Sequence, residues 1–570
     1  MAEHVTLLPG RYRAWLSAAV LAVSMAFGTA AAAKDWPLWT AADSLGRNGD
    51  LSFARIGSFG NGAYPYERMM PGSMFRVRVD GVPMRSLSPF GPDLDRIPAE
   101  YIGSVSHGGT DIDITTGGVG GKLPVTRMQF GQGARKRFQY HVLLSRPVGE
   151  TGRLIAGGTS KGIHGNDTIL ASMFRSYIVG YRKMRGDGGS TFLTLQAYRD
   201  RDNIPDIIAE TPMGRRESDD VSISAGVRRM VIGDGLALSS RAYYSSDISR
   251  VKRYGAANHI DDDMAGGALE IAFDRGNTAF TVKAVHDSRI FDSRIHDEKW
   301  KRHDTGIFVS GVVDNERLRV AFSGGTVLSS KFGAAPSVEG ELRFPVSRGM
   351  SLGLSGRYIE SHPDPGVEYY PSLVFSDSSI VADIDSYSMT EAVCDVAAGK
   401  GSYSFAVEGF VARLARPYFD PAETICRMGR TASYSGGRIR SRWSNSEIGS
   451  VGLSSSFRRP LDSGWDKEDD IRLWPYPVFD IGVDGELRRT IYRGLLTVGV
   501  FGDARYCAWP GDAAEPGRSL LIDGGVTVVI GSMTLFYRME NIAGQETMWF
   551  DTFGNQGRNG MWGIQWELTD

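Results

Sequence analysis

The chain has 570 residues and a formal net charge of −2, and 71 of its residues are glycine. Glycine is thus about 12% of the chain, against about 7% in an average protein. Aromatic residues make up 10%, which does not fit intrinsic disorder. The near-neutral charge excludes a broad basic surface for nucleic acid. No apolar run reaches the roughly 18 residues of a spanning helix, which excludes a helical membrane protein.

Residues 1–33 have the pattern of a secretory signal peptide. Two arginines precede an apolar run, Ala14–Phe27, and small residues follow at 29–33. The run is too short to span a bilayer, and this order of charged, apolar and small residues is typical of a cleavable export signal. We therefore expect cleavage after Ala32 or Ala33 and an exported mature protein.

Residues 34–123 contain a β-hairpin signal followed by a signal for a short helix. Alternating valines lead into Asp80-Gly81-Val82-Pro83, in which Asp-Gly favours a tight turn. Further along, Asp93-Leu94-Asp95-Arg96-Ile97-Pro98 places a proline where a helix can begin at Ala99. We expect these residues to form a small α+β domain.

From residue 124 to residue 570 the chain repeats segments of roughly ten residues in which apolar and polar side chains alternate. Val221, Ile223 and Ala225, for example, alternate with serines and a glycine. Alternation with a period of two gives a β-strand one apolar and one polar face. We count 22 such segments, with 366–376 assigned to an external loop rather than to a strand.

The links between these strands distinguish a soluble sandwich from a membrane barrel. Short links such as Gly233-Asp234-Gly235 alternate with long ones at 199–219, 249–264 and 287–304. Short turns at one end and long loops at the other are typical of transmembrane barrels, and a closed sheet has no edge strand to protect. We therefore predict an all-β fold, a transmembrane antiparallel barrel of 22 strands over 124–570.

Three His-Asp pairs fall within one of the predicted external loops. They are His286-Asp287, His296-Asp297 and His303-Asp304. Imidazole and carboxylate groups together suit borderline divalent ions such as Zn²⁺, so these six residues are a candidate metal site. A solvated polar loop is the alternative, because the external loops of barrels are hydrophilic in any case.

The last predicted strand, 560–568, carries aromatic residues on one face. Trp562, Ile564, Trp566 and Leu568 alternate with Gly563 and two polar residues. The order Gly563-x-x-Trp566-x-Leu568 resembles the C-terminal assembly signal of outer-membrane barrels. That resemblance implies the barrel assembly machinery and outer-membrane lipids as partners. An ordinary edge strand would alternate in the same way.

Several of these segments, in this order, resemble TonB-dependent outer-membrane receptors. The run from Asp80 to Pro98 resembles their plug domain, 128–205 resembles their first five barrel strands, and Phe536–Asn541 resembles their penultimate strand. The resemblance implies a plug formed by 34–123 inside the barrel and a place in the outer membrane of a Gram-negative bacterium. It also implies uptake of a scarce ligand, such as a metal chelate or a molecule the size of a cofactor.

Two departures from the family concern energy coupling. Roughly the N-terminal half of the usual plug is missing from 34–123, and the sequence after Asp35 has no β-branched stretch that resembles a TonB box. The resemblance implies the TonB complex as a partner, whereas the departures predict weak or no TonB dependence. The alternatives are a TonB-independent gated porin and a non-transporting surface receptor or scaffold.

The sequence offers little sign of catalysis. No nucleophile-elbow, zinc-protease or phosphate-loop motif occurs, so we expect neither an enzyme nor a bound cofactor. The three cysteines, Cys394, Cys426 and Cys507, are too few for a disulfide scaffold. Cys426 and Cys507 are both expected towards the external side, where the sequence allows either a disulfide or two free thiols.

Overall fold

The computed structural model describes residues 40–42, 45, 51–55, 63–68, 70, 74–85, 91–108, 110–117, 123–163, 172–186, 189–205, 212–253, 256–293, 298–315, 317–362, 387–415, 417–420, 425–428, 432–445, 447–461, 477–508, 518–544 and 558–569. The predicted signal peptide, 1–33, lies outside these residues. Within them, no helix combines the length and the apolar character that crossing a bilayer requires.

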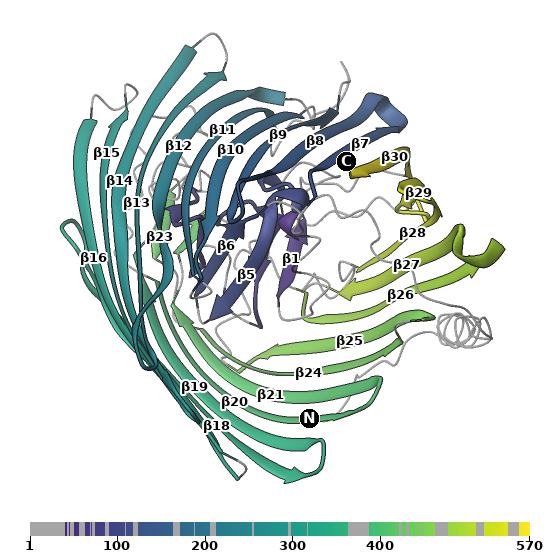
Figure 1. Ribbon diagram of the computed structural model, residues 1–570. Coiled ribbons are helices and arrows are strands. Elements are labelled where there is room, and N and C mark those ends of the chain that lie inside the picture. Colours follow the sequence, from purple (N-terminus) through teal and green to yellow (C-terminus); the bar gives the residue numbers. More distant parts are fainter. Residues whose placement is uncertain are drawn as a thin grey trace.

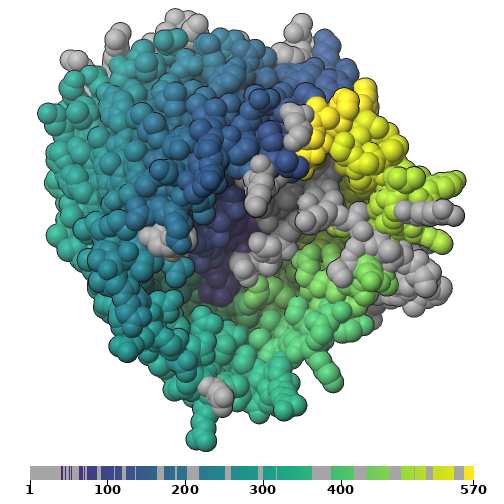
Figure 2. Space-filling view, viewed as in Figure 1, coloured from purple at the N-terminus to yellow at the C-terminus, as the bar shows by residue number. Residues whose placement is uncertain are grey.

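Two small sheets at the N-terminal end of the chain lie inside a ring of longer strands (Figure 1). In the larger sheet the strand order is β4-β3-β6-β5, and β3 and β6 run parallel. The smaller sheet pairs β1 with β2. The bounds are β1 Ser52–Arg55, β2 Ala63–Tyr66, β3 Arg76–Val79, β4 Val82–Pro83, β5 Ile102–Gly108 and β6 Asp111–Thr116. We call the described part of 40–117 the plug; Figure 2 shows it in purple, enclosed by the ring.

The turn between β3 and β4 follows from the Asp80-Gly81 pair. Their φ angles are 50° and 90°, as a tight hairpin turn requires. A Cβ atom on Gly81 would lie 2.4 Å from Cδ of Arg241 in the barrel wall, so the position needs glycine for its space as well. The short helix predicted at Ala99 is only a 3-10 turn, η3 (Ala99–Tyr101), because β5 begins at the next residue.

The long strands form a closed antiparallel barrel of 22 strands, as the sequence predicted, and β7 pairs with β30 to close it. The strands are β7 Val125–Gly133, β8 Arg137–Val148, β9 Gly152–Ile163, β10 Ser172–Met184, β11 Ser190–Pro205, β12 Pro212–Gly233, β13 Leu236–Arg253, β14 Ala256–Arg275, β15 Thr278–Ser293, β16 Glu298–Asp314, β17 Arg319–Ser329, β18 Gly333–Ser347, β19 Met350–Ser361, β20 Tyr387–Lys400, β21 Tyr403–Ala415, β24 Ala432–Asn445, β25 Gly449–Pro460, β26 Phe479–Ile491, β27 Leu496–Ala508, β28 Arg518–Ile530, β29 Met533–Glu540 and β30 Asn559–Thr569.

Shorter elements join these strands. A separate hairpin, β22 (Pro417–Asp420) with β23 (Ile425–Met428), follows β21 in the chain, and 3-10 turns occur at η2 (Leu94–Arg96), η4 (Ala134–Lys136) and η6 (Tyr492–Gly494). We call the end of the barrel with tight turns such as Gly233–Leu236 the periplasmic end, and the opposite end the external end.

The outer wall of the barrel is apolar and the lumen is polar. On β12, Val221 and Ile223 are 50% and 45% exposed, whereas Ser222 and Ser224 face inward and are buried. The same alternation runs along β8, where the outward Tyr140, Val142 and Leu144 are exposed. An apolar outer band around a closed barrel is a lipid-facing surface. The wall therefore places this chain in the outer membrane.

Three of the predicted long loops are largely strand. The links expected at 199–219, 249–264 and 287–304 shorten, because β11 to β16 continue well beyond the apolar band. Apolar alternation stops where lipid stops, but backbone pairing continues: Arg201 still faces Glu217 across β11 and β12. Alternation therefore marks the membrane-facing length of a strand and not its whole length. The segment 366–376 lies outside the described residues.

Charge should be costly on the outer face of β16 and tolerated on its inner face. Ile307 faces outward and is 53% exposed, whereas Ser310 faces the lumen. We expect Ile307→Arg to destabilise the assembled barrel by about 2–4 kcal/mol, the cost of a lipid-facing arginine near the midplane. Ser310→Arg is the matched control and should assemble normally. Urea titration of the folded, heat-modifiable band on gels measures both, and equal midpoints would contradict the inside–outside assignment.

Candidate functional site

The first half of the predicted plug signature, Asp80, Gly81 and Pro83, joins the plug to the barrel wall. The Asp80 carboxylate is buried and accepts hydrogen bonds from the backbone N–H of Thr116, at 3.0 Å, and from the Thr116 hydroxyl. It also forms an ion pair with Arg228 on β12. One carboxylate thus fixes the β3–β4 turn, the end of β6 and the wall together. Pro83 pairs with Arg78 in the hairpin.

The second half of the signature, Asp95, Ile97 and Pro98, holds the start of the described chain. Thr40 donates its hydroxyl to the Asp95 carboxylate at 2.8 Å and forms a β-bridge with Pro98. The backbone N–H of Ala41 donates to the Ile97 carbonyl oxygen, also at 2.8 Å. Residues 40–42 therefore pack against the plug.

The plug is attached to two separate arcs of the wall, β11–β15 and β19–β24. Towards β11–β15, Arg78 pairs with Asp287 at 2.7 Å and Arg85 with Asp262 at 3.3 Å. Arg96 pairs with Asp200 on the same side. Each of these three plug arginines is therefore matched by a specific carboxylate on the wall.

Along β19–β24 the plug shares an apolar core with the wall. Ile359 of β19, Met389 of β20 and Phe410 of β21 pack in one buried cluster with plug residues that include Met70 and Val77. Its other wall members are Tyr387, Val393, Ala412, Leu414, Tyr434 and Cys507. The plug is held on this side by buried apolar surface, whose contribution is spread over the whole contact area and not concentrated in a few charge pairs.

A charged cluster completes the attachment beside that apolar core. Glu67 pairs with Arg357 at 2.9 Å, and Arg68 pairs with Glu391 at 3.0 Å. Burial alone would raise the pKa of the Glu67 carboxyl, but the charges of Arg357 and Arg68 outweigh it and lower this pKa from 4.5 to about 2. The carboxylate is therefore ionised at every physiological pH.

Acid should loosen this cluster. Because the pKa of Glu67 is depressed in the folded state, its contribution to stability is complete above about pH 4.5 and is lost as the pH falls through about 2. A shift of this size corresponds to on the order of 3 kcal/mol. We expect faster amide hydrogen exchange in 63–70 at pH 3 than at pH 6, after correction for intrinsic rates.

The control for this acid effect is Glu67→Gln, which cannot titrate. Its exchange in 63–70 should already be faster at pH 6, because Arg357 and Arg68 each lose one carboxylate partner and keep only Glu391 or Glu408 nearby. It should also change less between pH 6 and pH 3. An identical pH response in both proteins would assign the effect to other carboxylates.

The structure separates the predicted metal ligands. His286 and Asp287 lie on β15, and His303 and Asp304 lie on β16, so the prediction of one loop is wrong for these four. The strands extend because their backbones stay paired through this region. Asp287 faces the lumen and pairs with Arg78, whereas the stacked His286 and His303 rings, 6.2 Å apart, belong to the outward-facing residues.

His296 and Asp297 lie outside the described residues, so the six-residue site stays a prediction. Within the described part of the chain, no three His, Cys, Asp or Glu side chains come together as a metal site would require. Asp287 and Asp304, which face each other across the two strands, each have an arginine partner instead.

Aromatic and cationic side chains gather at the external end of β15–β19. The Phe291 and Trp300 rings stack 5.0 Å apart, and the Lys331 ammonium lies 4.9 Å from the Trp300 ring. The Arg302 guanidinium lies 5.0 Å from the Phe332 ring. We call these five residues the mouth cluster. Arg302 also pairs with Asp304 at 2.8 Å.

Sequence reasoning missed the mouth cluster. Its members come from β15, from β16 and from the turn after β17, and only the strand register brings them together. The available signal was the spacing of Trp300, Arg302 and Asp304, which puts all three on one face of β16. Chemically, rings beside cations favour a ligand that is flat and negatively charged.

The terminal strand β30 places its two tryptophans on the outer face of the barrel. Trp562 and Trp566 are 50% and 43% exposed on the outer wall. At Gly563 a Cβ atom would lie 2.3 Å from the Phe536 ring and 2.1 Å from the Phe130 carbonyl oxygen, so only glycine fits beside β29 and β7. Leu568 is partly buried near the periplasmic end. Its role in assembly stays a prediction.

The cysteines show one free buried thiol. Cys507 on β27 is buried and forms no disulfide, and Cys394 on β20 is also free. The side chain of Cys426 lies outside the described residues, although its backbone belongs to β23.

No protein-family profile and no curated protein sequence matches the chain, but solved structures share its fold. The FrpB iron transporter from Neisseria meningitidis (F3-3 variant) has a TM-score of 0.72 at 12% identity, over 95% of this chain and 100% of that chain. The copper transporter OprC has a TM-score of 0.71 at 13% identity, over 94% and 97%. The siderophore receptor PirA from Pseudomonas aeruginosa has a TM-score of 0.65 at 12% identity, over 89% and 92%. The chain therefore has the fold of the TonB-dependent outer-membrane receptors that its sequence resembles.

Proposed function

We propose that this protein is an outer-membrane receptor that captures a scarce small ligand at its external end and admits it past a movable plug. The observation that carries the proposal is a closed barrel whose lumen holds a plug tied to the wall largely by charge pairs. A 22-stranded barrel has a wide lumen, and a plug converts an open channel into a selective one.

The two kinds of attachment support a direction for the movement. The side towards β11–β15 is held mainly by ion pairs such as Arg78–Asp287 and Arg85–Asp262. These pairs are nearly buried, so they separate at low cost only when water enters and solvates both charges. The side towards β19–β24 is held by a continuous apolar core, which costs more to open. We propose that the passage opens between the plug and β11–β15 while the apolar side acts as the hinge.

The mouth cluster supports the class of ligand. Lys331 and Arg302 lie beside the Trp300 and Phe332 rings, and Arg302 also pairs with Asp304. A planar anionic ligand, such as a metal chelate or a cofactor-sized molecule, would compete for these contacts. The names of the structures with the same fold refer to iron, copper and siderophores, which agrees with a metal chelate.

A cross-link between the plug and the β11–β15 side of the wall should stop uptake. We expect Arg78→Cys with Asp287→Cys, joined by a short bismaleimide in a background without the native cysteines, to block uptake at least tenfold. The matched control joins Glu67→Cys to Arg357→Cys on the hinge side and should leave most uptake. The substrate is whichever radiolabelled ferric or cupric chelate, or corrinoid, a gene-deleted strain fails to use.

The outcomes of this experiment separate the possible functions. If both cross-links block uptake, the plug moves as a whole and the hinge is wrong. If neither does, ligand passes without plug movement and the barrel is a porin. If no compound in the panel depends on the gene while one of them binds at the surface, the protein is a non-transporting receptor.

We also propose weak or no dependence on the TonB complex. An energised partner grips an extended strand by β-augmentation. Residues 41, 42 and 45 are helical and buried in the plug core, and Thr40 bridges to Pro98. This part of the chain is therefore not a free strand that a partner could grip.

A protonophore tests that independence. Uptake of the ligand found above should fall by less than twofold when the proton-motive force is collapsed, and a proline placed between Asp35 and Thr40 should have as little effect. Loss of uptake in both cases would instead make the first residues of the mature chain a divergent TonB box.

A further inference from the structure

Three arginines lie together on the outside of the barrel at the external ends of β10 and β11. Arg175, Arg199 and Arg201, with Met173, line a pocket of about 50 Å³. The neighbours of Arg175 on β10, Phe174 and Ser176, face the lumen and are buried. The arginines therefore point away from the lumen.

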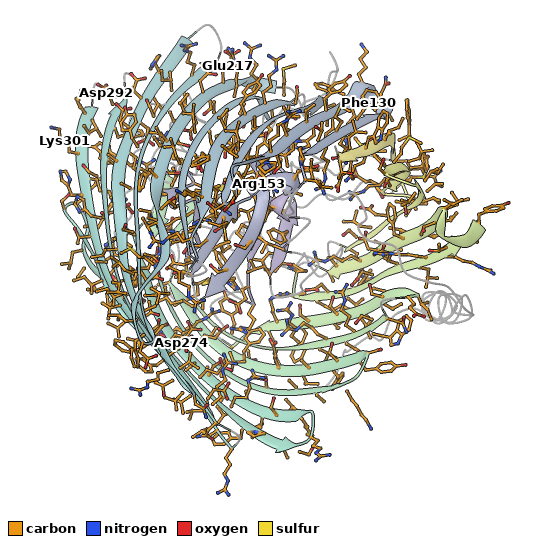
Figure 3. All side chains as sticks on the ribbon, viewed as in Figure 1. Phe130, Arg153, Glu217, Asp274, Asp292 and Lys301 are labelled. Atoms are coloured by element: carbon orange, nitrogen blue, oxygen red, sulfur yellow. The ribbon has the colours of Figure 1, made fainter. Side chains whose placement is uncertain are left out.

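The pocket sits where the apolar band ends. On the outward face of β10, Arg175 is followed towards the periplasmic end by Tyr177 and Val179, which are 53% and 50% exposed. On β11, Leu195 and Leu193 follow Arg199 in the same way, 46% and 48% exposed. The arginines are thus at the level of the lipid headgroups of the outer leaflet. Figure 3 labels Glu217, the strand partner of Arg201, at the upper rim of the wall.

The arrangement leaves the charge of one arginine, Arg175, without a carboxylate partner. Arg175 and Arg199 are directly opposite each other in the β10–β11 ladder, and like charges in that position repel. Arg175 has no hydrogen-bond or ion-pair partner in the part of the chain that the structure describes. An anion between the two guanidinium groups would remove the repulsion.

Two carboxylates orient the other arginines without using their outer nitrogens. Asp219 lies 3.3 Å from Nε of Arg199, and Glu217 lies 3.4 Å from Nε of Arg201. Both contacts involve Nε, which leaves the terminal amino groups of two guanidinium groups for a ligand. Arginine presents these donors in a planar fork that matches phosphate oxygens.

We propose that this pocket binds a phosphate group on the headgroup of a phosphorylated glycolipid in the outer leaflet. The phosphate would lie among the three guanidinium groups, and the acyl chains would lie on the adjoining surface of Tyr177, Val179 and Leu195. Continuity of the pocket with the apolar band favours a lipid over a soluble anion. The site is on the opposite face of the wall from the lumen, so it does not depend on whether the barrel transports.

Native mass spectrometry of the detergent-purified protein tests the site with a bisphosphorylated lipid A and with the same lipid after dephosphorylation. We expect the bisphosphorylated lipid to bind at least tenfold more tightly. The triple variant Arg175→Gln, Arg199→Gln, Arg201→Gln should lose that preference. Arg413→Gln is the matched control, because Arg413 is also exposed and outward at the external end of β21 but faces Thr390 and Ser433 rather than another arginine.

Several results would overturn the proposal. They are equal binding of the two lipids, an unchanged preference in the triple variant, and the same loss in Arg413→Gln. Displacement of the lipid by inorganic phosphate at a similar concentration would make the pocket a site for a soluble anion. If the triple variant does not reach the heat-modifiable form, the single variant Arg175→Gln is measured instead, because it breaks no ion pair in the described structure. We expect its preference for the bisphosphorylated lipid to fall at least threefold. An unchanged preference would overturn the site.

Discussion

The lack of water in a bilayer determines this architecture. Every backbone N–H and C=O group at that depth needs a partner within the protein, and a strand sheet meets the requirement only by closing on itself. The pairing of β30 with β7 closes the sheet. A ring of 22 strands then leaves a lumen too wide for side chains to fill, so a second structure has to occupy it. The plug, its charge pairs and its apolar core are consequences of that closure.

The plug is held by two different kinds of contact on its two sides. The apolar core shared with β19–β24 buries side chains such as Tyr387 and Leu414 almost completely. Entry of water there would expose apolar surface and would cost free energy. The contacts to β11–β15 pair charges that water solvates well. A single small domain is thus attached by buried apolar surface on one side and mainly by charge pairs on the other.

The sequence was sufficient to predict the architecture, because the alternation of side chains that marks a barrel strand is set residue by residue along the strand. Alternation of Val221, Ile223 and Ala225 with small polar residues follows from which side of a strand meets lipid, and the Asp80-Gly81 turn follows from backbone geometry. The ends of the strands were harder to predict. β12, for example, continues through polar residues that show no apolar alternation and are held in the sheet by backbone hydrogen bonds. Long-range contacts were out of reach: nothing near Glu67 in the sequence indicates Arg357, 290 positions away. The mouth cluster could not be predicted for the same reason, because its residues are brought together by the strand register and not by their spacing in the sequence.

The unequal length of the strands gives the molecule a sloping profile. β12 has 22 residues and β14 has 20, whereas β29 has 8. A tilted strand needs only about 10 residues to cross the hydrocarbon, so the longest strands stand about 20 Å above it. Among the strands that the structure describes, the rim is therefore high at β12–β14 and low at β29. The described strands thus reach further from the membrane on the β12–β14 side than on the β29 side.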